Sequence, residues 1–218
     1  MAKRDGASGG RVKQKARTRN ALVEALRELL ARGQDPSVAD VAAAAGISRT
    51  TAYRYFPDRH SLLGSALPET GQVSLLDDAE QLRVTDPVTR FELALTRHFA
   101  FMRRWEPQLR AALRASLEGN DQPMLRGGRA VRWYADALAP LSQSRPELDV
   151  DALAVRLRAV AGIEPHVWLT GVAGLSRSAS YDVMRANAMA VLADALGPAS
   201  LDVRGSSVDC DAAELTRG

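Results

Sequence analysis

The hydrophobic positions in the N-terminal part of the chain repeat at helical spacing. Leu22, Leu26 and Leu29 fall on one face of a helix, and Gly33 follows them as a stop signal. This pattern predicts a first helix over residues 15–32.

Two short helices and a tight turn are predicted next. Ser37 and Asp40 have the spacing of a capping box, which starts the second helix. Gly46 can adopt the positive φ that a tight turn needs, and Ser48 can cap a third helix over residues 49–56. This arrangement is typical of a helix-turn-helix.

The chain changes character after the fourth predicted helix. Asp58 can cap that helix, which covers residues 59–67 and is stopped by Pro68. Residues 68–87 are acidic and poorly periodic, so we place a domain boundary there.

Apolar residues return at helical spacing beyond this boundary. They predict one helix before Pro107, another from Pro107 onward, and two final helices over residues 150–172 and 179–196. Aromatic and β-branched residues are scarce, whereas Ala, Leu and Arg are abundant. We therefore expect an all-α fold of about nine helices, with an N-terminal three-helix helix-turn-helix domain and a C-terminal helical regulatory and dimerisation domain.

The composition excludes several classes of protein. Of the 218 residues, 46% are hydrophobic, enough for a sizeable core. Cys210 is the one cysteine, so neither an intramolecular disulfide nor a cysteine-pair metal site can form. Because no apolar run reaches about 18 residues and no apolar stretch follows the charged N-terminus, we expect a cytoplasmic protein that is neither secreted nor membrane-spanning.

Positive charge is concentrated at the N-terminus. The net charge is only +3, yet residues 1–19 carry seven Lys or Arg side chains against the single acid Asp5. Two interpretations fit this block: an arm that binds nucleic acid, or a solvated tail with no partner.

The third predicted helix has an apolar face and an open face. Ala52 and Phe56 can anchor it to the preceding helices. The open side then carries hydroxyl, aromatic and basic side chains: Thr50, Thr51, Tyr53, Arg54 and Tyr55. Such a helix fits the major groove of DNA, where Arg54 can donate to O6 and N7 of guanine. The alternative is that Tyr53 and Tyr55 simply pack against the domain.

Residues 37–63 (SVADVAAAAGISRTTAYRYFPDRHSLL) resemble the DNA-binding segment of the tetracycline-repressor (TetR) family. The resemblance rests on the Ala-Gly-Ile-Ser turn and the Thr-Ala-Tyr-Arg-Tyr-Phe run, and it is strong over about 50 residues. Ala52 departs from the family pattern by replacing a more common Leu, and Pro57 shortens the link to the fourth helix. The resemblance implies a DNA-binding homodimer with a four-helix interface.

The resemblance also implies roles for single residues. Tyr53 would bind backbone phosphate, and Arg59 would match the usual phosphate-binding Lys. At the start of the first helix, Arg17 can reach the DNA backbone, and Lys13 and Lys15 can enter the adjacent minor groove. The candidate DNA contacts are Ser37, Arg49, Thr50, Thr51, Tyr53, Arg54, Tyr55, Arg59, Lys13, Lys15 and Arg17.

Dimerisation is expected to involve the last two predicted helices, because one helix-turn-helix covers only a few base pairs. The helix over residues 150–172 is apolar on more than one face, with Val155 and Ile163 beside the face of Leu157 and Trp168. One face can pack within its own domain and the other against the twofold mate.

A pocket for a small apolar or aromatic ligand is predicted in the C-terminal domain. Its candidate residues are His98, Phe99, Met102, Trp105, Trp133, Glu164 and Trp168. The alternative is that these side chains fill a solid core. Glu164 shares a face with Trp168, and either Arg97 or Arg132 can pair with it.

The sequence contains no catalytic or metal-binding pattern. His60, His98 and His166 are far apart and form no HExxH motif, so we expect neither an enzyme nor a bound metal or cofactor. We expect a repressor that binds a palindromic operator in double-stranded DNA as a dimer and is released by a small ligand. The alternatives are a helix-turn-helix factor without a ligand, or an activator.

The expected organisation has four parts. They are a flexible basic arm (residues 1–12), a helix-turn-helix DNA-binding domain (13–67), a helical ligand-binding and dimerisation domain (68–200) and a flexible tail (201–218).

Overall fold

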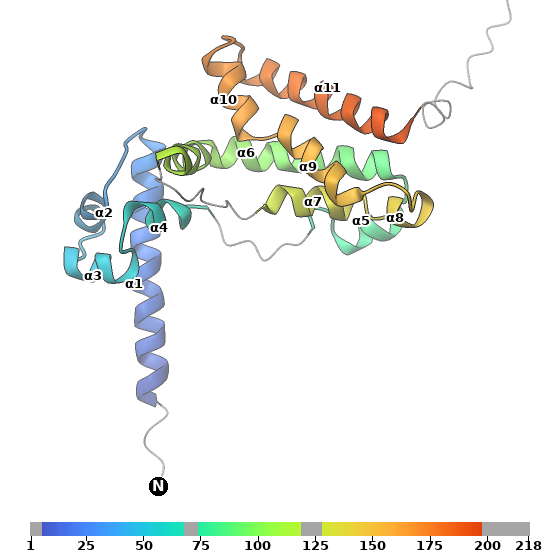
Figure 1. Ribbon diagram of the computed structural model, residues 1–218. Helices are drawn as coiled ribbons and strands as arrows, with labels where there is room; N and C mark the ends of the chain where they lie inside the picture. Colours follow the sequence, from blue (N-terminus) through green and yellow to red (C-terminus); the bar gives the residue numbers. More distant parts are fainter. Residues whose placement is uncertain (1–5, 68–73, 119–127, 198–218) are drawn as a thin grey trace, which may run out of the picture. The chain divides into compact units, whose positions relative to one another are not determined.

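The structure is a computed structural model that describes residues 6–67, 74–118 and 128–197 (Figure 1). Eleven helices and no strand occur in these three ranges, which confirms the all-α fold. The predicted tail over residues 201–218 lies outside them, as do residues 1–5 of the predicted arm and the proline expected to end the fourth helix.

The helices fall into two compact units. The first unit contains α1 (Gly6–Ala31), α2 (Val38–Ala44), α3 (Arg49–Tyr55), α4 (Arg59–Gly64) and the part of α6 (Pro87–Glu118) from Thr96 onward. The second unit contains the start of α6 together with α5 (Asp78–Arg83), α7 (Arg129–Ala137), α8 (Leu141–Ser144), α9 (Val150–Val160), α10 (Ile163–Gly171) and α11 (Arg177–Leu196). Helix α6 therefore contributes to both units, and the boundary at residue 68 stays a prediction.

The core of the first unit forms around the predicted apolar stripe of α1. Leu22 and Leu26 are fully buried there and pack with Leu62 of α4. Small residues on α6, Ala111 and Ala115, belong to the same core. Figure 1 shows α2 and α3 lying beside α1 in this unit.

Helix α1 begins at Gly6, well before the expected start near Lys15. Residues 6–12, predicted to be a flexible arm, are therefore helical. The sequence of this segment has no apolar stripe, so it gave no signal for a helix. None is required for packing, because these N-terminal turns of α1 extend past α2 and α3 (Figure 1). With 26 residues at about 1.5 Å each, α1 is about 39 Å long.

Pro107 kinks α6 instead of separating two helices. The backbone leaves the helical region at Trp105 (φ −114°, ψ 19°), two residues before the proline, and the helix then continues. A proline inside a helix removes one N–H donor and crowds the carbonyl four residues earlier, which explains a bend at this place.

The second unit packs α6, α7 and α9 around aromatic side chains. Phe91 and Tyr134 are buried and meet edge to face, with ring centres 5.1 Å apart. The Tyr134 hydroxyl donates to the carbonyl of Ala161 at 3.4 Å, and burial raises the pKa of this phenol.

The predicted helix over residues 150–172 is divided into α9 and α10. Gly162 lies at the break, and the guanidinium of Arg158 occupies the space that a Cβ at residue 162 would fill. Arg158 crosses there to pair with Glu164 at 2.8 Å, so the glycine makes room for the ion pair. The expectation of one continuous helix over this segment was therefore wrong.

Two divisions, one merger and helix α5 account for the difference from the nine expected. Residues 150–172 form two helices, and so does the segment before Pro146, where apolar spacing from Val131 predicts one, whereas the two helices expected on either side of Pro107 are one. Helix α5 lies within residues 68–87, where the sequence allows a short helix. It begins with a capping box in which the side chain of Asp77 accepts from the backbone N–H of Glu80 and the side chain of Glu80 accepts from that of Asp77.

Candidate nucleic-acid interface

Three side-chain caps set the starts of α2, α3 and α4, each at the residue expected. Ser37 and Asp40 form the predicted capping box, in which Asp40 accepts from the backbone N–H of Ser37 at 2.8 Å and Ser37 Oγ accepts in return at 3.2 Å. Ser48 caps α3, and Asp58 caps α4 by accepting from the N–H of Ser61 at 2.7 Å. These caps satisfy N–H groups that a short helix otherwise leaves without partners.

The turn between α2 and α3 is tight because of one glycine. Gly46 has φ +65°, in the left-handed region that residues with a Cβ avoid. The following residue, Ile47, donates its N–H to the carbonyl of Ala42 at 2.9 Å and packs its side chain against the core. The direction of α3 relative to α2 is therefore fixed by backbone geometry.

Helix α3 is anchored on one face and open on the other. Ala52 and Phe56 are 0% and 4% exposed and belong to the core of the first unit, as expected. Tyr53 is 46% exposed, although a tyrosine that only stabilised the fold would normally be covered. The other exposed members of α3 are Arg49, Thr50 and Arg54.

Two of the residues expected on the open face are half-buried instead. Tyr55 packs against the core of the first unit, where its ring also lies 5.9 Å from Cζ of Arg54. Thr51 is drawn toward the start of the helix, because Ser48 Oγ donates to its Oγ1 at 2.8 Å. Arg49, Thr50, Tyr53 and Arg54 therefore make up the open face of α3.

Arg59 is held by a carboxylate that the sequence analysis did not single out. Its guanidinium pairs with Oδ1 of Asp35, in the link between α1 and α2. The same oxygen accepts from Arg114 of α6 at 3.2 Å. The cation expected to bind a phosphate therefore already has an anionic partner, although the pair is partly open to solvent.

The N-terminal half of α1 presents a basic surface. Lys13, Lys15 and Arg17 are all exposed, and they lie on the part of α1 that extends beyond the helix-turn-helix. The hydroxyl of Ser37, by contrast, donates to the carboxylate of Asp40 at 2.6 Å within the cap of α2. Its role as a DNA contact stays a prediction.

The electrostatics around the helix-turn-helix favour an anionic partner. Arg49 and Arg54 are the charged residues of α3, and neither end of that helix carries an acid. The nearest acid with a perturbed pKa is Asp40, whose hydrogen bonds from the side chain and backbone of Ser37 hold its pKa below the ordinary value. Asp40 is therefore ionised at neutral pH and committed to the cap.

The predicted pocket residues are distributed over both units. His98, Phe99 and Met102 are buried, and they lie on the part of α6 that belongs to the first unit. Trp105, at the kink of the same helix, is half-buried. Trp133 is 2% exposed in the second unit. A shared pocket for these residues stays a prediction.

Two of the pocket candidates differ from expectation. Trp168 was expected to face the interior but is 57% exposed, because the break at Gly162 turns α10 relative to α9. Glu164 pairs with Arg158, a partner the sequence analysis did not name. Glu164 therefore has an ion-pair partner within its own unit.

Exposed apolar side chains gather on α9 and α10. Val155 on α9 is 56% exposed, and Trp168 and Val172 at α10 are 57% and 73% exposed. Ile163, also expected to face a partner chain, is buried within the unit. These three exposed apolar side chains make α9 and α10 candidate contact surfaces.

Neither metal-binding clusters nor membrane-spanning helices were found among the described residues. No group of three or more His, Cys, Asp or Glu side chains is arranged to hold a metal ion in these ranges. In the same part of the chain, no helix is both long and apolar enough to cross a membrane.

The sequence analysis missed two arginines of α1 that contact residues following α3 and α4. Arg27 donates from Nε to the carbonyl of Ala66 at 2.8 Å, and its guanidinium lies 5.1 Å from the ring centre of Trp105. Arg19, noted only as a possible backbone contact, lies over the ring of Phe56. The signal that could have located them is their spacing of eight residues, which places both on one side of α1.

Residues 21–66 match the sequence model of the family described as "Bacterial regulatory proteins, tetR family". The matched segment runs from α1 through the end of α4, so it contains the helix-turn-helix and its three caps.

Two known proteins are similar to this chain. The HTH-type transcriptional repressor LfrR of Mycolicibacterium smegmatis is 45% identical over 47 residues, which are 22% of this chain and 25% of the repressor. A crystal structure of a protein assigned to the TetR family of transcriptional regulators, from Mesorhizobium loti, aligns with 82% of this chain and 96% of its own at 18% identity and a TM-score of 0.44.

Proposed function

We propose that the chain is a DNA-binding transcriptional repressor of the tetR family of bacterial regulatory proteins, whose sequence model its residues 21–66 match. The observation that carries the proposal is the open face of α3. A short, capped and core-anchored helix exposes Tyr53 at 46% together with two arginines and a threonine, and no acid interrupts them. Such a surface matches a helix that enters the major groove.

Within the groove, the exposed residues divide into two roles. Arg54, near the end of α3, donates to O6 and N7 of a guanine, with Thr50 beside it at a base edge or phosphate. Tyr53 and Arg49 bind backbone phosphates, which position the helix without reading sequence. Lys13, on the extended start of α1, reaches the adjacent minor groove together with its basic neighbours.

The active form proposed is a homodimer. A palindromic operator presents two half-sites about one helical turn apart, so two copies of α3 must be held at that spacing. The exposed apolar surface of Val155, Trp168 and Val172 supports dimerisation through the C-terminal helices, because a second copy would cover it.

The proposed response to a small ligand concerns the aromatic residues beyond α4. Phe99 and Met102, both on the part of α6 that belongs to the first unit, are apolar enough to contact a small apolar or aromatic molecule. Such a ligand releases DNA only if it binds more tightly to a dimer whose recognition helices are wrongly spaced. We therefore propose that the protein represses transcription in the bacterial cytoplasm and that ligand binding releases it from DNA.

Selection of bound sequences from a random duplex library tests the proposal. The full chain should enrich a twofold-symmetric motif with half-sites one helical turn apart. As a matched control, Arg32→Gln removes a positive charge that directly follows α1, pairs with Glu28 and is not part of α3, and it should enrich the same motif. An enriched motif without twofold symmetry would contradict the dimer, and enrichment of no motif at all would contradict specific DNA binding. Failure of a panel of aromatic compounds to release the selected DNA would favour a factor without a ligand.

A further inference from the structure

Residues 12–17 of α1 are exposed and belong to the part of the helix that extends past α2 and α3 (Figure 1). Val12 is 66% exposed there although it is apolar. Single apolar side chains are common on protein surfaces, so Val12 by itself does not mark a site. Its position on the helix, between Lys13 and Lys15, makes this segment a candidate contact surface.

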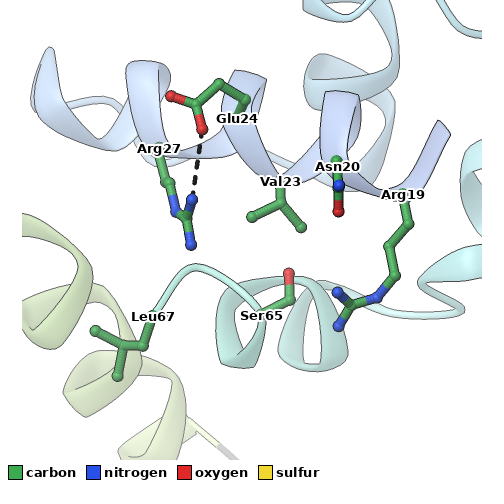
Figure 2. Close-up of a pocket in the computed structure, with 7 residues that line it drawn as sticks. All are labelled: Arg19, Asn20, Val23, Glu24, Arg27, Ser65 and Leu67. Atoms are coloured by element: carbon green, nitrogen blue, oxygen red, sulfur yellow. Dashed lines mark hydrogen bonds and ion pairs between the residues drawn. The ribbon is translucent and has the colours of Figure 1, made fainter. Parts of the chain in front are cut away.

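One side of this segment continues the side of α1 that packs against the helix-turn-helix. Residues seven apart lie on nearly the same line along an α-helix, because each turn has 3.6 residues. Val12 is seven residues before Arg19, whose guanidinium lies 5.9 Å from the ring centre of Phe56, directly after α3. Ala16 is seven residues before Val23, which is 6% exposed in the core of the first unit. Figure 2 shows Arg19 and Val23 pointing from α1 toward the end of α4.

Two lysines flank that side of α1. Successive residues of an α-helix are about 100° apart around its axis. Relative to the line midway between Val12 and Ala16, two exposed lysines therefore lie about 80° to either side: Lys13 and Lys15. Gln14 lies on the opposite side of the helix. We call Val12, Lys13, Lys15 and Ala16 the basic face of α1.

The charge along the start of α1 calls for an anionic partner. Residues 6–23 contain five Lys or Arg side chains and no acid, and the first acid of the helix, Glu24, pairs with Arg27 at 3.4 Å (Figure 2). Lys13 and Arg17 are four residues apart, and like charges at this spacing destabilise a helix. A partner with negative charge spread along its length would remove that repulsion.

We propose that the basic face of α1 lies over the minor groove of DNA, next to the base pairs that α3 reads. Lys13 binds phosphates of one strand, Lys15 binds phosphates of the other strand, and Val12 and Ala16 contact the sugars between them. Duplex DNA fits because its two backbones are two parallel lines of negative charge, as the two lysines are two lines of positive charge.

The dimensions of the helix decide how it sits on the groove. An α-helix with its side chains is about 10–12 Å across, whereas the minor groove is about 6 Å wide. The helix therefore stays above the groove and bridges its two walls. Residues 6–17 are about 18 Å long at about 1.5 Å each, which is enough to pass the major groove, about 12 Å wide, and reach the next one.

This orientation of α1 rests on the proposed function and adds to it. Val12 and Ala16 become DNA contacts, and the start of α1 binds as a helix instead of as an extended arm. The distinction is testable, because successive side chains of an extended chain alternate between two sides. Gln14 and Ala16 would then lie on the same side, whereas in the helix they lie on opposite sides.

Ala16→Glu and Gln14→Glu form a matched pair, since both positions are exposed and both changes add one negative charge to the same helix. Fluorescence anisotropy with the selected and scrambled duplexes at fixed salt measures their effects. Ala16→Glu should weaken both duplexes at least about tenfold, because the new carboxylate faces phosphates at close range. Gln14→Glu should weaken them no more than about threefold, because its carboxylate points away and solvent screens it.

Hydroxyl-radical cleavage of the selected duplex gives a second test, because these radicals attack deoxyribose from the minor groove. The unchanged protein should protect both strands of the minor groove next to each half-site. At saturating protein, Lys13→Gln should expose one of these strands and Lys15→Gln the other. Each change should also lower the slope of log affinity against log salt by about 0.9.

The outcomes separate this inference from the proposed function. Equal losses for Ala16→Glu and Gln14→Glu would mean that the segment binds as an extended arm, and selective binding without protection of the adjacent minor groove would mean that α1 does not lie there. Either result overturns the inference and leaves the proposed function standing. Ala16→Glu could instead abolish binding to phosphatidylserine vesicles and leave both duplexes unaffected, which would assign the basic face to a membrane. If the unchanged protein binds no duplex, the proposed function itself is wrong, and the inference with it.

Discussion

Arg59 and Asp35 form an ion pair at the start of α4, and the same carboxylate oxygen also accepts from Arg114 of α6. Arg59 is the residue that the family resemblance assigns to a DNA phosphate. Asp35 and a phosphate offer the same kind of anionic oxygen, so the two compete for one guanidinium. All three side chains keep contact with solvent, which allows exchange between partners.

Asp35→Asn should raise the affinity for the selected duplex about two- to fivefold, because an exposed ion pair contributes about 0.4–1 kcal/mol. Fluorescence anisotropy at fixed salt measures this change. Glu28→Gln is the matched control, since it removes an equal charge from α1 that pairs with Arg32, just after that helix. In an Arg59→Ala background, Asp35→Asn should gain no more than that control does. An equal gain in both backgrounds would mean that Asp35 acts only through long-range repulsion.

Substitutions at Arg54 and Tyr53 should weaken DNA binding in different ways. Arg54→Ala should cost about 1–3 kcal/mol on the selected duplex and relax the preference at one position in each half-site, because a base contact is lost. Tyr53→Phe should weaken all sequences about equally, because only a phosphate contact is lost. Competition with scrambled duplexes distinguishes the two. Equal losses on specific and scrambled DNA for Arg54→Ala would place Arg54 at the backbone.

Arg90 should be the most sensitive charged position of the second unit. Its guanidinium is 4% exposed and donates to four carbonyls, those of Ala137 (2.8 Å), Gln81 (3.0 Å), Val84 (3.2 Å) and Asp136 (3.2 Å). Arg90→Ala should lower the free energy of unfolding by about 2–4 kcal/mol, because these acceptors lose their donors. Urea unfolding measures the loss.

Arg83→Ala is the control for that experiment. Arg83 is exposed and donates only within its own helix, to the carbonyl of Ala79 at 3.3 Å, so its replacement should change stability by less than about 0.5 kcal/mol. Similar losses for Arg90→Ala and Arg83→Ala would show that the four-carbonyl contact contributes little.

The cap of α2 should depend on pH through Asp40. Hydrogen bonds from Ser37 lower the pKa of Asp40 in the folded state, so its stabilising effect is fully present above the unfolded value of about 3.9 and is lost as pH falls through the folded value. NMR titration of the Asp40 carboxyl should give a pKa below the ordinary value of an aspartate. Ser37→Ala should raise the pKa of Asp40 toward its ordinary value. An equal pKa in both proteins would contradict the capping role.

Local signals predicted the DNA-binding segment well. Ser37, Ser48 and Asp58 cap the helices that they were expected to cap, and Gly46 has the positive φ of the expected turn. Each of these features depends on residues within four positions of one another. Caps and turns of this kind can be predicted from the sequence, because the residues that form them are close together along the chain.

Features that depend on contacts between distant segments were missed. Asp35 lies 24 residues from Arg59, and Arg90 lies 47 residues from Ala137, so no periodicity relates them. The exposure of Trp168 was also missed, because the sequence analysis extended one helix through the break at Gly162. A sequence pattern gives the period of a helix, whereas the partners of each side chain depend on how helices pack.

Sequence-specific binding is tested by the affinity for the selected duplex and for a scrambled duplex, measured across a series of salt concentrations. We expect the selected duplex to be bound at least about 10³-fold more tightly than the scrambled one. We also expect log affinity to fall linearly with log salt, by about 0.9 for each phosphate neutralised. Equal affinity for both duplexes, or an affinity that salt does not change, would contradict sequence-specific DNA binding by α3 and the basic surface of α1.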